Sequence, residues 1–153
     1  MPISSEKYLI LFSSELELFI NDIKIMNILI IDTTKDKIFL THIVDKNIYT
    51  CSHENSKINF ERMIILVNDF LKTNKTSLNQ LNTIYVNRGS SSFAGIRNLL
   101  SMIKALLLTK NIDYYCFSYT DFVGLNEIKP EDIPNLCKKF KIKKNLINPI
   151  YLS

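Results

Sequence analysis

The run NILIID at residues 27–32 constrains the fold more than any other part of the chain, because it places four apolar residues side by side. A strand with one face in water alternates apolar and polar residues. A continuous apolar run is instead typical of a strand that is buried on both faces. We therefore expect Ile28 to Ile31 to form a central strand that is covered on both sides.

Further strands and helices follow this run in a regular order. Residues 37–44 and 48–52 are rich in β-branched and aromatic side chains and flank the turn-like segment 45–47, so with the first strand they predict an antiparallel meander. Beyond them, apolar residues recur at helical spacing and alternate with short strand patterns. The expected elements are a helix around 60–71, a strand over 81–86, a helix over 94–110 and a strand over 114–117.

This order predicts an α/β fold with a five-stranded mixed sheet, a three-strand antiparallel meander and flanking helices. It resembles a ribonuclease-H-like half of the actin and sugar-kinase superfamily. Three parts are expected along the chain: an N-terminal extension over 1–25, a ribonuclease-H-like lobe over 26–126, and a basic C-terminal tail over 127–153. Whether 1–25 is native or Met26 is the natural start stays open.

Composition excludes several classes of protein. The 153 residues suit one compact domain, and a net charge of +4 permits contact with nucleic acid without arguing for it, since the lysines are spread along the chain. Three distant cysteines without a CxxC spacing and two histidines without ligand partners predict no disulfide framework, no metal site and a reducing cytoplasm. No apolar run approaches the ~20 residues of a membrane helix, and the N-terminus lacks the pattern of a signal peptide.

Two turns could carry a binding function. Asp32, Thr33 and Thr34 follow the central strand, where backbone amides and hydroxyls can cradle a phosphate. An ordinary polar turn is the alternative interpretation. The segment NRGSSSFAGIRN at 87–98 links a predicted strand to a predicted helix and holds two of the three glycines of the chain. It predicts a special turn that binds an anion or simply caps the helix.

The second turn carries a resemblance to a known family. GSSSFAGIR at 89–97 resembles the glycine-rich GPGSFTGLR loop of the TsaB (YeaZ) family. The matching residues of this loop are Gly89, Ser92, Phe93, Gly95 and Arg97. The segment Asp32-Thr33-Thr34 resembles the D-T-[ST] that ends the first strand of the family. PIYL at 149–152 resembles its terminal P-x-Y-L-R, with Ser153 in place of the arginine.

The chain also departs from the family. Ser90 and Ser91 replace the proline and one glycine of the loop, and Asn98 and Leu99 replace small residues at the start of the second helix. Family members have two ribonuclease-H-like halves, whereas little sequence separates the first half from PIYL here. The resemblance thus implies a member shortened to its N-terminal lobe.

The resemblance implies a non-catalytic protein of tRNA threonylcarbamoyladenosine synthesis, with no cofactor of its own. It implies binding to a TsaD-like subunit through the helices of the first lobe, with TsaE as a third component and tRNA contacted only through the complex. A homodimer of the isolated protein is a further expectation. We predict that the interface uses Phe60, Met63, Ile64, Val67, Leu100, Ile103 and Leu107, although each of these could instead fill the core.

Two other functions stay open. A nucleotide-binding remnant would use the turn at Asp32 and the loop at Gly89 as a phosphate site. A ribonuclease-H-like scaffold would associate with itself. Catalysis is disfavoured, because the sequence offers no nucleophile with a paired base and no cluster of carboxylates on one face.

Overall fold

The computed structural model describes residues 26–89, 93–110 and 112–145, with the side chains of 93–96 and 106–110 left out. Its strands are β1 (Asn27–Asp32), β2 (Lys37–Val44), β3 (Asn47–Glu54), β4 (Thr83–Asn87) and β5 (Asp113–Phe117). Its α-helices are α2 (Lys57–Glu61), α3 (Met63–Thr73), α4 (Phe93–Lys110) and α5 (Ile133–Lys139). Short 3₁₀ helices are η1 (Leu78–Gln80), η2 (Tyr119–Asp121) and η3 (Pro130–Asp132).

The five strands form one mixed sheet in the order β3-β2-β1-β4-β5. β1, β2 and β3 pair antiparallel, while β4 lies parallel to β1 and β5 lies parallel to β4. β1 is the central strand, and all six of its residues are buried. The expected five-stranded mixed sheet with its antiparallel meander is therefore confirmed, and each predicted strand lies within two residues of the observed one.

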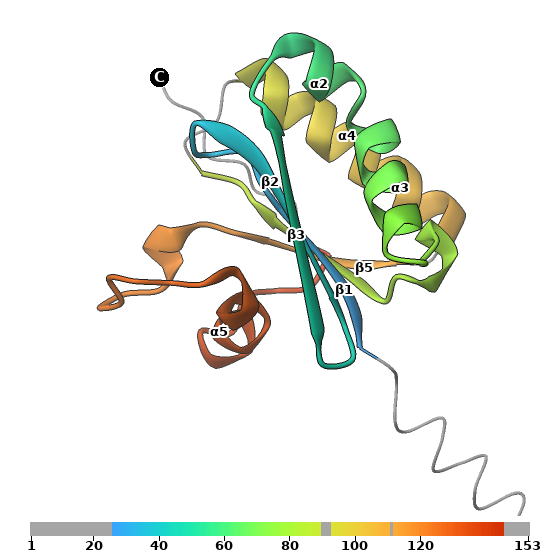
Figure 1. Ribbon diagram of the computed structural model, residues 1–153. Helices are drawn as coiled ribbons and strands as arrows, with labels where there is room; N and C mark the ends of the chain where they lie inside the picture. Colours follow the sequence, from blue (N-terminus) through green and yellow to red (C-terminus); the bar gives the residue numbers. More distant parts are fainter. Residues whose placement is uncertain (1–25, 90–92, 111, 146–153) are drawn as a thin grey trace, which may run out of the picture.

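Helices α2, α3 and α4 cover one face of the sheet, which we call the helix face (Figure 1). Its core is largely aliphatic and joins strand residues such as Leu29 and Ile84 to helix residues such as Val67 and Ile103. The helix expected around 60–71 is divided at Arg62, which ends α2 and begins α3. The helical run nevertheless continues, because Arg62 N–H donates to Ile58 and the Arg62 carbonyl accepts from Leu66.

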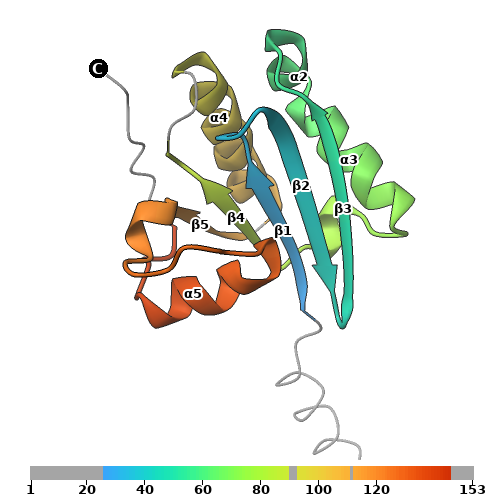
Figure 2. The same ribbon diagram turned by 60° about the vertical axis from the view of Figure 1, so that its left-hand side comes forward.

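α5 covers the opposite face of the sheet, which we call the α5 face (Figure 2). Ile133 and Cys137 of α5 are buried there against Ile30 of β1 and Tyr85 of β4. The segment expected as a basic tail thus contributes to a second core. The division of the chain at residues 26 and 126 stays a prediction, and 1–25 and 146–153 lie outside the described residues.

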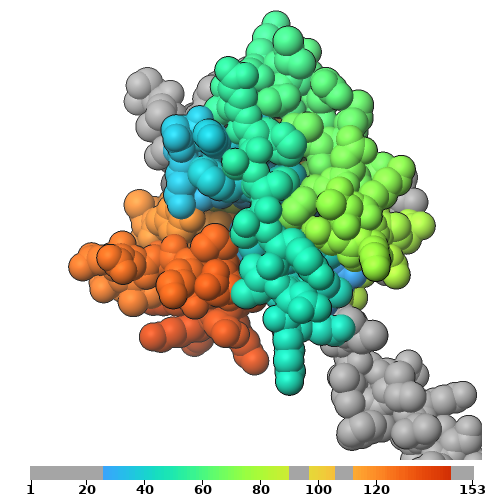
Figure 3. All heavy atoms as spheres, in the orientation of Figure 1, coloured from blue at the N-terminus to red at the C-terminus, as the bar shows by residue number. Residues whose placement is uncertain are grey.

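β3 is an edge strand and lies at the surface between the two layers (Figure 3). Beneath it, the His42 side chain of β2 is fully buried and hydrogen-bonded at both ring nitrogens, to Asn27 Oδ1 at 2.7 Å and to Asn74 Nδ2 at 3.2 Å. Burial lowers the pKa of His42, so the neutral imidazole is the form that fits. Within the described part of the chain, no helix combines the length and apolar character needed to cross a membrane.

Candidate functional site

A groove of about 520 Å³ lies on the outer side of the helix face, between α2–α3 and α4. Phe60, Met63 and Ile64 line one side of it, and Ser101 and Met102 of α4 line the other. α2 and α3 both contact α4, and the groove runs between them. Its lining is mainly apolar, with few polar groups to fix a small ligand.

The structure separates the predicted interface residues into two groups. Phe60, Met63, Val67, Leu100 and Ile103 are all buried in the core of the helix face. Ile64 is 39% exposed and lies in the groove, and Leu107 belongs to the part of α4 whose side chains are outside the description. The apolar residues that recur at helical spacing therefore mainly mark the side of each helix that packs on the sheet. Ile64 is the predicted residue with a described side chain open to a partner.

Two exposed isoleucines of α2 and α3 were not predicted to contact a partner. Ile58 of α2 is 65% exposed and Ile65 of α3 is 45% exposed. A signal for them existed in the sequence, since both fall outside the stripe that packs on the sheet. Large apolar side chains that a helix does not need for its own core are the ones available to another protein.

Asp32 stands at the end of β1, and its carboxylate is engaged within the protein. It accepts hydrogen bonds from Thr34 N–H at 2.9 Å, from the Thr34 hydroxyl at 2.6 Å and from the Tyr119 hydroxyl at 2.8 Å. Burial, followed by the charge of Asp32, raises the pKa of Tyr119, so this phenol keeps its proton and donates it. Thr33 is also buried.

This geometry bears on the proposed phosphate-binding turn. A phosphate at the turn would approach the carboxylate of Asp32, and two buried anions repel each other. The Thr34 hydroxyl, moreover, already accepts from Asn87 Nδ2 at 3.3 Å. The arrangement therefore favours a structural role for Asp32, Thr33 and Thr34, in which they join β1 to its neighbours.

Gly89 is the residue of the glycine-rich loop whose role the structure describes. A Cβ on Gly89 would lie 2.9 Å from Ser118 Oγ, closer than side-chain atoms normally approach. Gly89 N–H also donates to Asn87 Oδ1 at 3.1 Å. Ser92 is outside the described residues, Phe93 and Gly95 lie where the surroundings of α4 are not described, and Arg97 is exposed.

Arg88 and Asp121 form a pair that sequence reasoning missed. The Arg88 guanidinium donates to both carboxylate oxygens of Asp121, at 2.9 and 3.0 Å, and both side chains are largely buried. Asp121 also accepts from Ser118 N–H. Together with the Tyr119–Asp32 bond, this pair ties η2 to the carboxyl ends of β1 and β4. The residues are 33 apart in the chain, and no local pattern announces their contact.

A thiol and an imidazole lie close together on β3. Cys51 Sγ lies 3.7 Å from His53 Nε2, but burial raises the pKa of the Cys51 thiol to about 11. A thiol with such a pKa stays protonated at neutral pH and is a poor nucleophile. The described residues also contain no group of three or more His, Cys, Asp or Glu side chains that could hold a metal ion.

Comparisons with known proteins find a similar sequence and similar folds. The tRNA threonylcarbamoyladenosine biosynthesis protein TsaB of Buchnera aphidicola subsp. Baizongia pistaciae is 28% identical to this chain, over 46% of the chain and 38% of the relative. No family model matches the chain.

Solved structures show the same fold. YeaZ from Pseudomonas aeruginosa superposes with a TM-score of 0.55 and 17% identity, over 61% of this chain and 44% of that one. A second structure, described as an uncharacterized protein with similarity to peptidase YEAZ from Pseudomonas aeruginosa, gives the same TM-score and identity and is covered to 43%. The chain thus spans less than half of the length of each of these relatives, and the expected ribonuclease-H-like fold is confirmed.

Proposed function

We propose that this chain, a distant homologue of TsaB over about half of its length, is a non-catalytic component of the machinery that makes threonylcarbamoyladenosine in tRNA. In this role it binds a TsaD-like subunit through α2, α3 and α4. Homology to TsaB supports the pathway. The groove that Ile64 lines, on helices that also expose Ile58 and Ile65, is the observation that supports the binding surface.

The physical argument for the surface begins with exposed apolar area. Ile58, Ile64 and Ile65 of α2 and α3 leave large apolar side chains exposed, at a cost in free energy of about 25 cal/mol for each Å² of apolar surface left in water. A partner helix that laid its apolar side into the groove would cover them, as amphipathic helices do in hydrophobic grooves. The few polar groups of the groove leave little to recognise in a small polar ligand.

The buried members of the predicted interface take a different role in this proposal. Phe60, Met63 and Val67 hold α2 and α3 on the sheet, and Leu100 and Ile103 do the same for α4. Phe60 and Met63 also line the groove, whereas Val67, Leu100 and Ile103 support the helices from beneath without reaching it. TsaE would join the TsaD-like subunit as a further component, tRNA would be contacted through the assembly, and the cytoplasm would be its location.

A binding measurement tests the surface. The full chain is purified together with a TsaD-like subunit, and the dissociation constant is measured for Ile64→Glu and for Val123→Glu. Val123 is the matched control, because it is 79% exposed and lies on the turn after η2, outside the groove. We expect Ile64→Glu to weaken binding at least about a hundredfold, since a charge is buried without a partner, and Val123→Glu to have little effect.

Equal behaviour of the two variants would show that the partner binds elsewhere. The molecular mass of the chain in solution, measured without a partner, tests whether a second copy occupies the groove. If it does, the unchanged chain is a dimer and the Ile64→Glu variant is a monomer. The pathway has its own test. Deletion of the gene should lower the threonylcarbamoyladenosine content of total tRNA, measured by mass spectrometry of nucleosides, and an unchanged content would refute the proposed pathway.

A further inference from the structure

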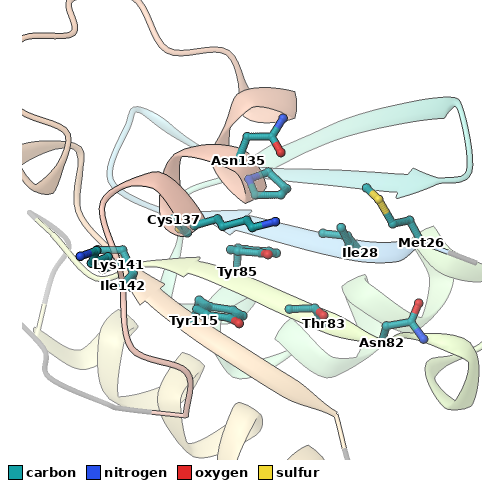
Figure 4. A pocket seen from close by; sticks show the side chains of 12 residues that line it. Met26, Ile28, Asn82, Thr83, Tyr85, Tyr115, Asn135, Cys137, Lys141 and Ile142 are labelled. Carbon is teal, nitrogen blue, oxygen red and sulfur yellow. The ribbon is translucent and has the colours of Figure 1, made fainter. Parts of the chain in front are cut away.

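A cavity of about 610 Å³ lies on the α5 face, at the opposite end of the strands from Asp32 and Gly89. Its floor is formed by the beginnings of β1 and β4 together with Tyr115 of β5, and α5 forms its wall (Figure 4). This volume lies within the range of sites that hold a small molecule. The cavity shares no residue with the groove of the helix face.

Two tyrosines give the floor a specific chemistry. The rings of Tyr85 and Tyr115 stack with centroids 5.0 Å apart and planes 10° apart, and Figure 4 shows their hydroxyls on the same side. Tyr85 is only 8% exposed, yet no described group hydrogen-bonds its hydroxyl. No buried side-chain oxygen of the described chain lacks a partner, so this hydroxyl must open into the cavity.

The Tyr85 hydroxyl is therefore a free hydrogen-bond donor. Burial, followed by the neighbouring Cys137 and Tyr115, raises the pKa of Tyr85 above its usual range, so the phenol keeps its proton. Because it opens into the cavity, the hydroxyl can donate to a molecule that enters there. A ligand with an acceptor atom would satisfy it.

The charge at the rim is positive. Lys138 of α5 and Lys141 after it line the cavity, and no carboxylate does. Neither lysine forms an ion pair with a described residue. Lys141 adopts a positive φ of 55°, a conformation that L-residues seldom take. Cationic side chains at the rim of an aromatic and hydroxyl-bearing floor match a ligand that is planar and apolar at one end and anionic at the other.

We propose that this cavity binds a nucleotide, with the base against Tyr85 and Tyr115 and the phosphate at Lys138 and Lys141. The stacked phenols offer a π surface and donors to the edge of a base, and the lysines neutralise the phosphate. The nucleotide comes either from the free pool or from a single-stranded segment of RNA. This site is independent of the partner surface proposed above.

Calorimetric titration of the full chain tests the proposal. The ligands are AMP, adenosine, inorganic phosphate and a short single-stranded oligoribonucleotide. The pair Lys138→Gln with Lys141→Gln removes the rim charge, and Lys139→Gln with Lys143→Gln is the matched control, because it removes equal charge from exposed residues outside the cavity. Tyr85→Phe removes the free hydroxyl while keeping the ring.

Saturable binding of AMP supports a site for the free nucleotide if three results accompany it. The rim pair of substitutions should weaken AMP binding about tenfold or more, Tyr85→Phe should weaken it several-fold, and the control pair should leave it unchanged. Binding of the oligoribonucleotide alone, with the same pattern among the variants, supports a nucleotide of RNA. The proposal is overturned if neither AMP nor the oligoribonucleotide binds, or if inorganic phosphate binds as tightly as AMP. It is also overturned if the control pair of substitutions weakens binding as much as the rim pair.

Discussion

The two faces of the sheet are built from different kinds of side chain. The helix face buries a continuous aliphatic cluster that includes Leu29, Ile31, Val67 and Leu71. The α5 face is smaller and richer in rings, with Phe117 stacked on Phe122 at 5.8 Å beside the pair of tyrosines at the cavity. One sheet therefore supports two unlike layers.

The difference shows how each face can be used. Branched aliphatic chains fill space closely, so the helix face closes its core and leaves surplus isoleucines on the outside. Flat rings and a single short helix of seven residues leave a hollow on the α5 face. The first arrangement suits a protein partner, and the second suits a small or extended ligand.

The largest expected effect on stability comes from shortening a buried side chain in the core of each face. Leu71→Ala should lower the free energy of unfolding by about 3 kcal/mol, because Leu71 of α3 is fully buried and the long helices cannot move to fill the cavity. Ile133→Ala on α5 should cost about 2 kcal/mol, because a short helix beside a cavity can shift. Urea denaturation measures both, and equal losses would mean that the two faces are equally rigid.

The next effect concerns the link between η2 and β1. Tyr119→Phe removes the hydroxyl that donates to Asp32 at 2.8 Å, and loss of a hydrogen bond to a charged group should cost about 2 kcal/mol. Tyr115→Phe is the control, because its hydroxyl has no hydrogen bond among the described residues. A similar loss of stability in the two variants would show that the contact with Asp32 contributes nothing.

A smaller effect is expected at the loop before α4. Gly89→Ala brings a methyl group to 2.9 Å from Ser118 Oγ, and the required shift should cost about 1 to 2 kcal/mol. The cost should shrink in a Ser118→Ala background, where the obstructing oxygen is gone. Thermal denaturation of the two single variants and the double variant measures this coupling. If the two single losses of stability simply add in the double variant, the added methyl group is not crowded by Ser118.

The smallest effect is a pH dependence that belongs to the helix face. His42 has a lowered pKa in the folded protein, so below about pH 6.5 the unfolded chain binds a proton that the folded chain does not. Stability should therefore fall between pH 7 and pH 5.5. His42→Gln should remove this fall and His53→Gln should keep it. If stability still falls over this pH range in the His42→Gln variant, another group causes the fall.

The sheet was predictable because its signals are local. The continuous apolar run of β1 indicated a central strand, and the alternation of helix and strand periods indicated the crossovers that make β4 and β5 parallel. The division of the first helix at Arg62 was missed, because no proline or glycine marks it. The packing of α5 was missed as well, since its lysines dominate the composition of a short segment.

The candidate sites were less predictable, because their contacts join distant residues. Tyr119 and Asp32 are 87 positions apart, and the sequence indicated the carboxylate but not its partner. Helical spacing correctly marked apolar positions, yet it could not separate Met63, which faces the sheet, from Ile64, which faces outward. Exposure decides between core and interface, and only the packed structure gives it.

The central position of β1 also affects how the chain emerges from a ribosome. β1 can pair with β2 as soon as the first hairpin is made, but its other edge waits for β4, which begins at Thr83. Until then the apolar residues Ile28 to Ile31 have one unpaired strand edge, and such a segment promotes aggregation of nascent chains. Slow translation before residue 87 would thus endanger yield more than slow translation after it, and chaperones that hold extended apolar strands would act in that interval.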